Sequence, residues 1–379
     1  MNSSQSTQPI SLSRLELIEV ALPQQESFRS AIGSRNERRA LYLRWWDRDE
    51  NWGIGECSCR PDPLYSAEFN EVVKKLIGGY LFERLPSEGT VGKIVALLDT
   101  IRGWPFSRAA LLDAVFDLIR RRGGSDALDA LPPRVEEIPA GISLGIFSTA
   151  TEAVTRVEQA LAQGYRRIKL KVRPSMDLEP LIAIRESAPD APLAFDANGS
   201  CNRADLTRFL PALLALDPLF IEQPFSPRRL DLCAELKRRQ PHARICLDEA
   251  VEERGDLLLA LRMSAIDELN LKPGRVGGQL ASIALLEECR ERGIPMWVGG
   301  MFETGIGRCA NLRFAARMPG AAAHDLSPST RYFPRDVVIS PLEMNTQGYI
   351  PALPETPVAV DETALRDLTC DHIILEKPA

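Results

Sequence analysis

Five ionisable side chains recur along the middle of the chain at a nearly constant spacing: Lys171, Asp196, Glu222, Asp248 and Lys272. The gaps between them are 25, 26, 26 and 24 residues. Each side chain follows or ends a short apolar run typical of a buried strand, and a strand, a helix of about three turns and two short loops occupy roughly that many residues. Repeated βα units place parallel strands with all their carboxyl ends on one face. The spacing therefore predicts that these five side chains meet at one mouth.

The residues before this repeat follow a different pattern. LYLRWWDRDENWGIGE alternates in hydrophobicity and is interrupted by charged residues and glycine, which is typical of a β-hairpin with its turn near residues 47–51. Helical spacing of apolar residues follows at residues 66–76, 91–98 and 107–122. The pair Pro132-Pro133 ends this region. We therefore expect an N-terminal α+β domain over residues 1–133.

From residue 134 to about 330, strands and helices alternate. A first strand, IPAGISLG, precedes a helical pattern over residues 148–163 that Gly164 ends. The five strands with the spaced residues follow, and PMWVGG near Met296 and AAAHDL near His324 bring the number of expected strands to eight. This alternation predicts an α/β barrel.

The last segment, residues 331–379, is rich in proline apart from a helical pattern that begins near Asp361. Such an irregular segment is poorly suited to supply a regular barrel helix. We expect it to pack back on the N-terminal domain.

Composition narrows the class of protein. The 379 residues carry a net charge of −6, which does not favour a nucleic-acid or membrane surface. No apolar stretch approaches the length of a membrane span, and the start, MNSSQSTQPISLSR, lacks the features of a signal peptide. Eight cysteines without a CxxC pair are typical of reduced thiols in the cytosol, and three histidines leave little material for a histidine-dependent site. We expect a cytoplasmic enzyme.

Three of the spaced residues are carboxylates at the ends of consecutive strands: Asp196, Glu222 and Asp248. Hard divalent cations prefer oxygen ligands, and Mg²⁺ usually keeps water or substrate oxygens in its other positions. Three carboxylates in register leave an open site that a substrate carboxylate can complete. The sequence therefore predicts a Mg²⁺ site, in which Mn²⁺ can substitute, and a small-molecule carboxylate substrate.

Lysines flank these carboxylates. Lys169 and Lys171 alternate on one strand, so both ammonium groups should point into the barrel. Neighbouring cations and burial both disfavour the charged form of a lysine, which would lower the pKa of a lysine in this pair toward that of a general base. Lys272 lies four strands further on, so it should face the opposite side of a bound substrate.

These residues stand in motifs that resemble the enolase superfamily, in its muconate-lactonizing subgroup: KxK, DAN, EQP, LDE and KPG. Four longer segments are similar to the o-succinylbenzoate synthase / N-succinylamino acid racemase branch: GIGECSCRPDPLYSAEF, LNLKPGRVGG, WVGGMFETGIGR and HDLSP. The resemblance runs from roughly Leu15 to Pro328. It implies a (β/α)7β modified TIM barrel, under an α+β capping domain that the C-terminal segment closes.

The resemblance assigns roles to individual residues. Asp196, Glu222 and Asp248 match the metal ligands, while Lys171 and Lys272 match the lysines of KxK and KPG. It also implies substrate contacts, at Asn198, Arg275, Gly300, Glu303, Arg29 and Ser30. The cap loop near residues 61–65 matches a specificity loop. The chain departs from the family pattern at Cys201, where an aromatic residue is usual, and this departure bears on the packing beside Asn198.

The activity that we expect first is that of a Mg²⁺-dependent o-succinylbenzoate synthase. Such an enzyme dehydrates 2-succinyl-6-hydroxy-2,4-cyclohexadiene-1-carboxylate in menaquinone biosynthesis. Lys171 would remove the proton next to the carboxylate, give an enediolate and then assist departure of the hydroxyl group from the same face. Lys169 would lower the pKa of Lys171. Lys272 would stabilise the anion from the other face without transferring a proton.

Three other functions are compatible with parts of the sequence. An N-succinylamino acid racemase needs Lys272 to deliver a proton from the opposite face, and Arg275 resembles racemase-capable members, so one protein can combine both activities. A dipeptide epimerase is disfavoured because His324-Asp325-Leu326 stands where an Asp-x-Asp pair is expected. A non-catalytic binding protein should have lost one of the five spaced residues, and all five are present. The sequence leaves the oligomeric state open, and the family resemblance is compatible with a homo-oligomer.

Overall fold

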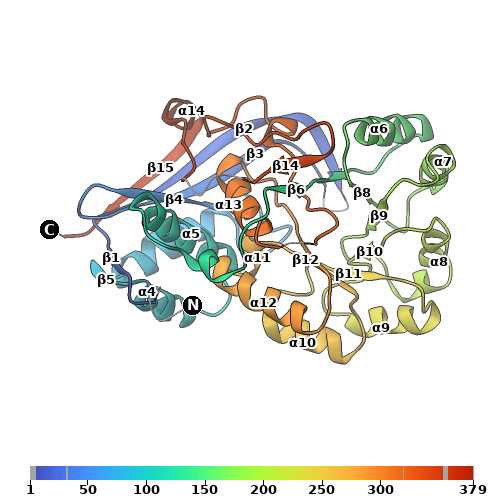
Figure 1. The fold of residues 1–379 in the computed structure, drawn as a ribbon, viewed down its shortest axis with the longest axis horizontal. Coiled ribbons are helices and arrows are strands. Elements are labelled where there is room, and N and C mark those ends of the chain that lie inside the picture. Colours follow the sequence, from blue (N-terminus) through green and yellow to red (C-terminus); the bar gives the residue numbers. More distant parts are fainter. Residues whose placement is uncertain (1–5, 31–32, 319, 353–356, 379) are drawn as a thin grey trace.

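The computed structural model describes residues 6–30, 33–318, 320–352 and 357–378, without the side chains of residues 26–30 and 33–35. It contains a parallel barrel and, beside it, a mainly antiparallel domain that includes both ends of the described chain (Figure 1). Among the helices that the structure describes, none is long and apolar enough to cross a membrane.

Seven parallel strands form the barrel sheet, in the order β13-β12-β11-β10-β9-β8-β7. Their bounds are β7 (Gly141–Leu144), β8 (Arg167–Lys171), β9 (Leu193–Asp196), β10 (Ile221–Glu222), β11 (Ile245–Leu247), β12 (Glu268–Leu271) and β13 (Met296–Val298). A helix follows each strand: α6 (Ala150–Ala162), α7 (Glu179–Ser187), α8 (Phe209–Leu214), α9 (Leu230–Arg239), α10 (Arg254–Arg262), α12 (Gln279–Glu291) and α13 (Gly305–Ala315). The short α11 (Pro273–Val276) precedes α12. The expected βα repeat is therefore present.

The expected eighth strand is reduced to a single bridge between His324 and Ala140. The amide of His324 donates to the carbonyl of Pro139, and the amide of Asp325 donates to the carbonyl of Val298. These bonds join the two edges of the sheet and close the barrel. The pairing ends there because these few hydrogen bonds already close the barrel. The fold is thus a (β/α)7β modified TIM barrel.

The capping domain contains a four-stranded antiparallel sheet in the order β15-β2-β3-β4. Its strands are β2 (Arg14–Ser30), β3 (Gly33–Trp46), β4 (Trp52–Cys57) and β15 (Thr369–Glu376). Its helices are α2 (Asn70–Leu76), the π-helix η1 (Ile77–Leu81), α3 (Phe82–Arg84), α4 (Val91–Asp99) and α5 (Pro105–Arg121). Two short strands, β1 (Pro9–Ser11) and β5 (Glu88–Thr90), pair beside them. The hairpin turn expected near residues 47–51 joins β3 to β4.

The first expected helix of this domain starts later than residue 66. Ser66 Oγ bonds to the backbone of Glu68, which holds a turn, and Phe69 is extended. Glu68 instead directs its carboxylate to the amides of Phe106 and Ser107, both at 2.9 Å, at the start of α5. A carboxylate at a helix N-terminus satisfies free amides and interacts favourably with the helix dipole. Glu68 therefore caps the N-terminus of α5 and does not form an additional turn of α2.

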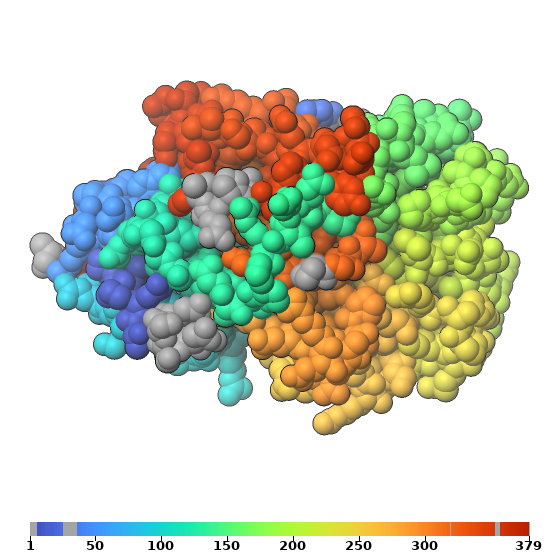
Figure 2. All heavy atoms as spheres, in the orientation of Figure 1, coloured from blue at the N-terminus to red at the C-terminus, as the bar shows by residue number. Residues whose placement is uncertain are grey.

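The C-terminal segment runs back to both parts of the molecule. β14 (Tyr349–Pro351) pairs with β6 (Glu137–Pro139) beside the barrel, and β15 pairs with β2 after the helix α14 (Glu362–Leu368). Figure 2 shows the C-terminal residues lying across the surface between the N-terminal residues and the first barrel helices. The segment therefore contributes a strand to the cap sheet.

Candidate active site

Strand register places the spaced residues at one end of the barrel. Lys171 pairs with Asp196, and Asp196 pairs with Glu222, so these three side chains point to the same face on neighbouring parallel strands. Asp248 and Lys272 follow the last residues of β11 and β12. The five residues predicted from their spacing are therefore brought together at the carboxyl ends of the strands.

A cavity of about 150 Å³ opens at this end, between the barrel and the cap. Its barrel wall contains Lys169, Lys171, Asp196, Asn198, Lys272 and Asp325. Its cap wall contains Gln24, Glu37, Arg38, Arg60 and Tyr65. The loop after β13 adds Gly300, Met301 and Phe302, and Arg308, Ser327 and Tyr332 also line it. The site thus lies where the cap covers the barrel mouth.

Each predicted metal ligand contacts a lysine. Lys171 Nζ lies 2.6 Å from Asp196 Oδ2 and 2.8 Å from Asn198 Oδ1. Lys169 Nζ lies 2.8 Å from Glu222 Oε2, and Lys272 Nζ lies 2.7 Å from Asp248 Oδ2. These contacts neutralise carboxylates that are almost completely buried.

Several acids compensate the charges of Lys169 and Lys272, the two most buried lysines of the site. Burial alone would lower the pKa of Lys169, but Asp325, Glu222 and Asp196 together raise it above the ordinary lysine value. Burial likewise acts against the charged form of Lys272, yet Tyr65 and the nearby carboxylates raise its pKa. The prediction of a lowered lysine pKa rested on burial, the neighbouring cation and a nearby metal ion, and it is wrong for Lys169. It omitted Asp325, whose Oδ2 lies 2.7 Å from Lys169 Nζ.

The predicted ligands have the chemistry of a site for a hard divalent cation. All their side-chain ligand atoms are carboxylate oxygens, which hard divalent cations prefer. An ammonium group contacts each of these carboxylates, so positive charge is stable beside them. Two further buried oxygens, Glu249 Oε2 and Asn270 Oδ1, have no hydrogen-bond partner within the described residues. The residues therefore fit Mg²⁺, although the oxygens of Asp196, Glu222 and Asp248 do not form a compact three-acid group in this structure.

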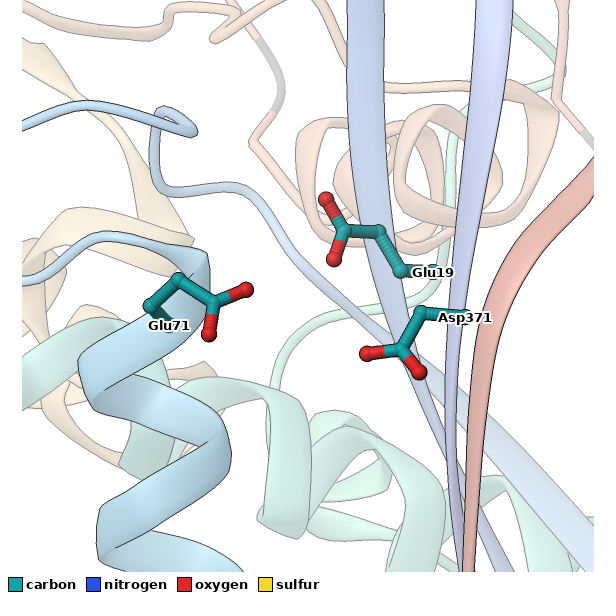
Figure 3. Close-up of side chains that lie close together, drawn as sticks. All are labelled: Glu19, Glu71 and Asp371. Atoms are coloured by element: carbon teal, nitrogen blue, oxygen red, sulfur yellow. The ribbon is translucent and has the colours of Figure 1, made fainter.

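Among the described residues, the three-acid group with ligand oxygens within 4.8 Å of one another is a different one, Glu19, Glu71 and Asp371 in the cap. Figure 3 shows their carboxylates converging from β2, α2 and β15. Lys74 Nζ lies 2.7 Å from Glu19, 2.6 Å from Glu71 and 2.7 Å from Asp371. An ammonium group already satisfies this cluster, so it is a structural ion-pair network within the cap.

The expected substrate-contact residues fall into three groups. Asn198 and Gly300 line the cavity. Arg275 lies behind the wall, where Nη1 is hydrogen-bonded to Asp248 Oδ1, and Glu303 accepts hydrogen bonds from the amide of Met301 and from Asn311. Glu303 thus contacts a residue of the wall, whereas Arg275 contacts Asp248 behind it, and contact of either residue with substrate stays a prediction. The side chains of Arg29 and Ser30 lie outside the described residues.

Cys201, the departure from the family pattern, is buried beside Phe225 through a backbone bridge. Its amide donates to the carbonyl of Pro224, so the backbone after Asn198 is held by the loop that follows β10. Asn198 itself has a φ of 43°, in the left-handed region that asparagine tolerates. All eight cysteines are free thiols, and Cys370 is the exposed one.

Several residues of the site were not found from the sequence. Asp325 bonds to Lys169 and to Arg167 Nη2, and Ser143 donates to the same carboxylate. Glu249 accepts a hydrogen bond from Asn198 Nδ2, and burial raises its pKa. Asp325 belongs to the HDL motif and Glu249 to the LDE motif. Each motif places a carboxylate at the end of an expected barrel strand, so both acids could have been predicted as site residues.

A parallel barrel with acids and lysines at the carboxyl ends of its strands, under a cap, defines a class of barrel enzymes. The family described as enolase C-terminal domain-like matches residues 152–362. The chain is 36% identical over 333 residues to N-succinylamino acid racemase of Amycolatopsis sp., covering 86% of this chain and 89% of the relative. It is 33% identical over 344 residues to o-succinylbenzoate synthase of Enterococcus faecalis, covering 89% and 92%.

The structural comparison agrees with these relatives. A crystal structure of an enolase-superfamily member from Listeria innocua superposes with a TM-score of 0.89 at 29% identity, covering 97% of this chain and 99% of that chain. The chain therefore belongs to the enolase superfamily and is an enzyme. Members of this superfamily use a lysine or histidine base beside Mg²⁺.

Proposed function

We propose that this enzyme is an o-succinylbenzoate synthase, which removes water from 2-succinyl-6-hydroxy-2,4-cyclohexadiene-1-carboxylate. The observation that carries the proposal is the placement of Lys171 and Lys272 on the cavity wall, from strands four positions apart in the barrel sheet. Positions so far apart in a closed barrel face a bound molecule from opposite sides. One lysine can thus transfer protons while the other stabilises the anion.

Lys171 is the proposed base and acid of the dehydration. Its Nζ takes the proton next to the ring carboxylate, and the electron pair becomes an enediolate. The carbon–oxygen bond to the hydroxyl group then breaks, and Lys171 returns the proton so that water leaves from the same face. Asn198, 2.8 Å from Lys171 Nζ, positions the ammonium group for both steps.

Asp196, Glu222 and Asp248 are the proposed residues that hold Mg²⁺. The bound ion would supply positive charge next to the substrate carboxylate, where negative charge increases during the reaction. The formal charges at the barrel end of the site support this assignment, because five acids there face five cationic side chains: Asp196, Glu222, Asp248, Glu249 and Asp325 with Arg167, Lys169, Lys171, Lys272 and Arg275. With Lys171 acting as a neutral base, a divalent ion and the substrate carboxylate at the reacting carbon bring the total charge at this end to zero.

N-succinylamino acid racemase is the second candidate activity. Lys272 lines the cavity, so its Nζ can reach a substrate carbon from the face opposite Lys171. Arg275 supports this role, since its contact with Asp248 holds the carboxylate that Lys272 also contacts. Racemisation requires both lysines to transfer protons, whereas dehydration requires only Lys171.

The test compares the two reactions in one preparation. Purified enzyme is freed of metal with a chelator and assayed with and without Mg²⁺, on the cyclohexadiene substrate and on N-succinyl amino acids. We expect Mg²⁺-dependent dehydration, at least a thousandfold loss in Lys171→Ala, and a loss of several kcal/mol of barrier stabilisation in Lys272→Ala. The two variants should differ in D₂O exchange, each exchanging only the enantiomer that faces its remaining lysine.

Three outcomes would contradict the proposal. Full activity after chelation would exclude the metal, and absence of dehydration alongside racemisation would favour the second candidate. Lys171→Ala protein that exchanges the protons of both enantiomers would identify another residue as the base.

Arg48→Met, in the exposed hairpin turn of the cap, serves as a control for a lost cation away from the site.

A further inference from the structure

The cavity has a second cationic end, formed by the cap. Arg38 and Arg60 line its cap wall, while the lysines line its barrel wall. Side chains of the loop after β13, Met301 and Phe302, lie along the cavity as well. The proposed reaction uses only the barrel wall, so the two arginines have no role in it so far.

Arg38 is a buried cation with incomplete hydrogen bonding. It is 4% exposed, and its Nη1 donates to the carbonyl of Cys59 at 2.7 Å. Its Nε and Nη2 have no hydrogen-bond partner among the residues that the structure describes, and the carboxylate of Glu56 is 3.9 Å from Nη2. A buried guanidinium with two unsatisfied nitrogens gives the cap wall a fixed positive charge.

Arg60 stands next to it in the loop after β4. Its side chain is 17% exposed, and its Nε has no hydrogen-bond partner in the described part of the chain, with Asp62 Oδ1 at 3.3 Å. Burial, and after it the charge of Arg38, lowers the pKa of Arg60. Glu37 also lines this wall, but it is exposed to water, which screens its charge. The two guanidinium groups would therefore be stabilised by an anion in the cavity.

We propose that Arg60, with Arg38 behind it, binds a second carboxylate of the substrate at the cap end of the cavity. The inference rests on the proposed function and names the residues that recognise the succinyl carboxylate of its substrate. The substrate carries one carboxylate at the reacting carbon and another on an arm that reaches the cap. A guanidinium group presents paired donors that match both oxygens of a carboxylate, whereas the barrel lysines act as point charges. Arg60 thus selects dianionic substrates over monoanionic ones.

The kinetic test uses two substrates that differ only in this group. An N-succinyl amino acid ends in a carboxylate, and the N-butanoyl derivative of the same amino acid ends in a methyl group. We expect wild-type enzyme to prefer the succinyl compound in kcat/KM, and Arg60→Met to reduce this preference at least tenfold, mainly through KM. Arg60→Lys, which keeps a positive charge, should restore part of the preference. Arg48→Met removes a cap cation whose partner is Glu88 and should leave the preference unchanged.

A binding measurement tests the subsite without turnover. Calorimetry compares o-succinylbenzoate with 2-butanoylbenzoate, which lacks the second carboxylate, on wild type, Arg60→Met and Arg48→Met. Loss of the preference in Arg60→Met alone supports the inference. An unchanged preference, or an equal loss for both compounds, overturns it. If the enzyme turns over neither reaction but still prefers the dicarboxylate through Arg60, then the proposed function fails while the subsite stands.

Discussion

Lys74 provides the positive charge at the centre of an acidic cluster that joins three elements of the cap. Its ammonium group contacts Glu19 on β2, Glu71 on α2 and Asp371 on β15. Lys74 and Glu19 are buried, whereas Glu71 is exposed and Asp371 is half-buried. Since Asp371 lies 297 residues from Lys74, this contact ties the C-terminal strand to the N-terminal domain.

We predict that Lys74→Met destabilises the protein by about 3 kcal/mol, because it leaves the buried Glu19 carboxylate without its closest cation. Loss of one partner of a buried ion pair costs roughly 3–5 kcal/mol. Arg39 and Asn70 still contact Glu19, so we expect a value at the low end of this range. Thermal unfolding measures the loss, and hydrogen exchange in β15 should become faster. Lys75→Met, at the exposed neighbouring position, should change stability by no more than about 0.5 kcal/mol. Equal effects of the two variants would contradict a structural role for the cluster.

At the scale of secondary structure, the close contact of β4 with α5 depends on glycine. A Cβ atom on Gly53 would lie 2.2 Å from the carbonyl oxygen of Ala114 and from the amide nitrogen of Leu118. Gly55 meets the carbonyl of Ala110 at the same distance. All three of these atoms belong to the backbone of α5, so they cannot rotate away as a side chain could. The alternation predicted the hairpin correctly. It did not indicate that β4 needs glycine at two positions that face α5.

We predict that Gly53→Ala destabilises the protein by about 3 kcal/mol, through displacement of α5 from the sheet. Gly79→Ala is the matched control, because a Cβ atom there meets nothing within 4 Å. Gly79 lies in the helical segment η1, so alanine should stabilise it by roughly 0.5–1 kcal/mol. Differential scanning calorimetry of the two variants should show shifts of opposite sign, and a neutral Gly53→Ala would refute the close approach.

At the scale of the whole molecule, carboxylates from two other segments hold the start of the barrel helix α13. Glu56 on β4 accepts hydrogen bonds from Thr304 Oγ1 at 2.7 Å and from the amide of Gly307 at 3.0 Å. Asp336 in the C-terminal segment accepts a hydrogen bond from the amide of Gly305 at 3.0 Å. The loop just before α13 lines the cavity, so these contacts fix the cap against the wall of the site.

Stability should depend on pH through Glu56. Burial raises the pKa of Glu56 to about 7 from an ordinary value of 4.5, against the effect of Arg38. Because the folded-state pKa is raised, the stabilisation is fully present below about 4.5 and is lost as the pH rises through about 7, by an amount of about 3 kcal/mol. Glu56→Gln lacks this titration, so wild type should lose Tm relative to the variant between pH 5 and pH 8.

The comparison is made at one scan rate, with Glu83→Gln as the control for a lost exposed carboxylate. Wild-type and Glu56→Gln curves that run parallel over this range would show that Glu56 does not carry the effect. Asp113, whose pKa burial also raises to about 7, titrates in all three proteins and cancels in the difference.

The spacing of residues along the chain was enough to predict the barrel and the end of it at which the charged residues lie. Parallel strands separated by helices end on one face, so a regular spacing was enough to bring Lys171, Asp196 and Glu222 together. The alternation of Lys169 and Lys171 was likewise sufficient, since both line the cavity. These properties follow from local periodicity, which short-range backbone geometry fixes.

The charges that face these residues come from distant segments, and their positions could not be predicted from the spacing. Asp325 meets Arg167 from 158 residues away, and Lys74 meets Asp371 from 297 residues away. The arginines of the cap reach the cavity because one domain covers the other, and no spacing along the chain records that approach. The eighth strand was expected but is a single bridge, because closure of the barrel needs only the few hydrogen bonds around His324. Contacts between distant segments depend on how whole elements pack, and this packing sets the electrostatic environment of the site.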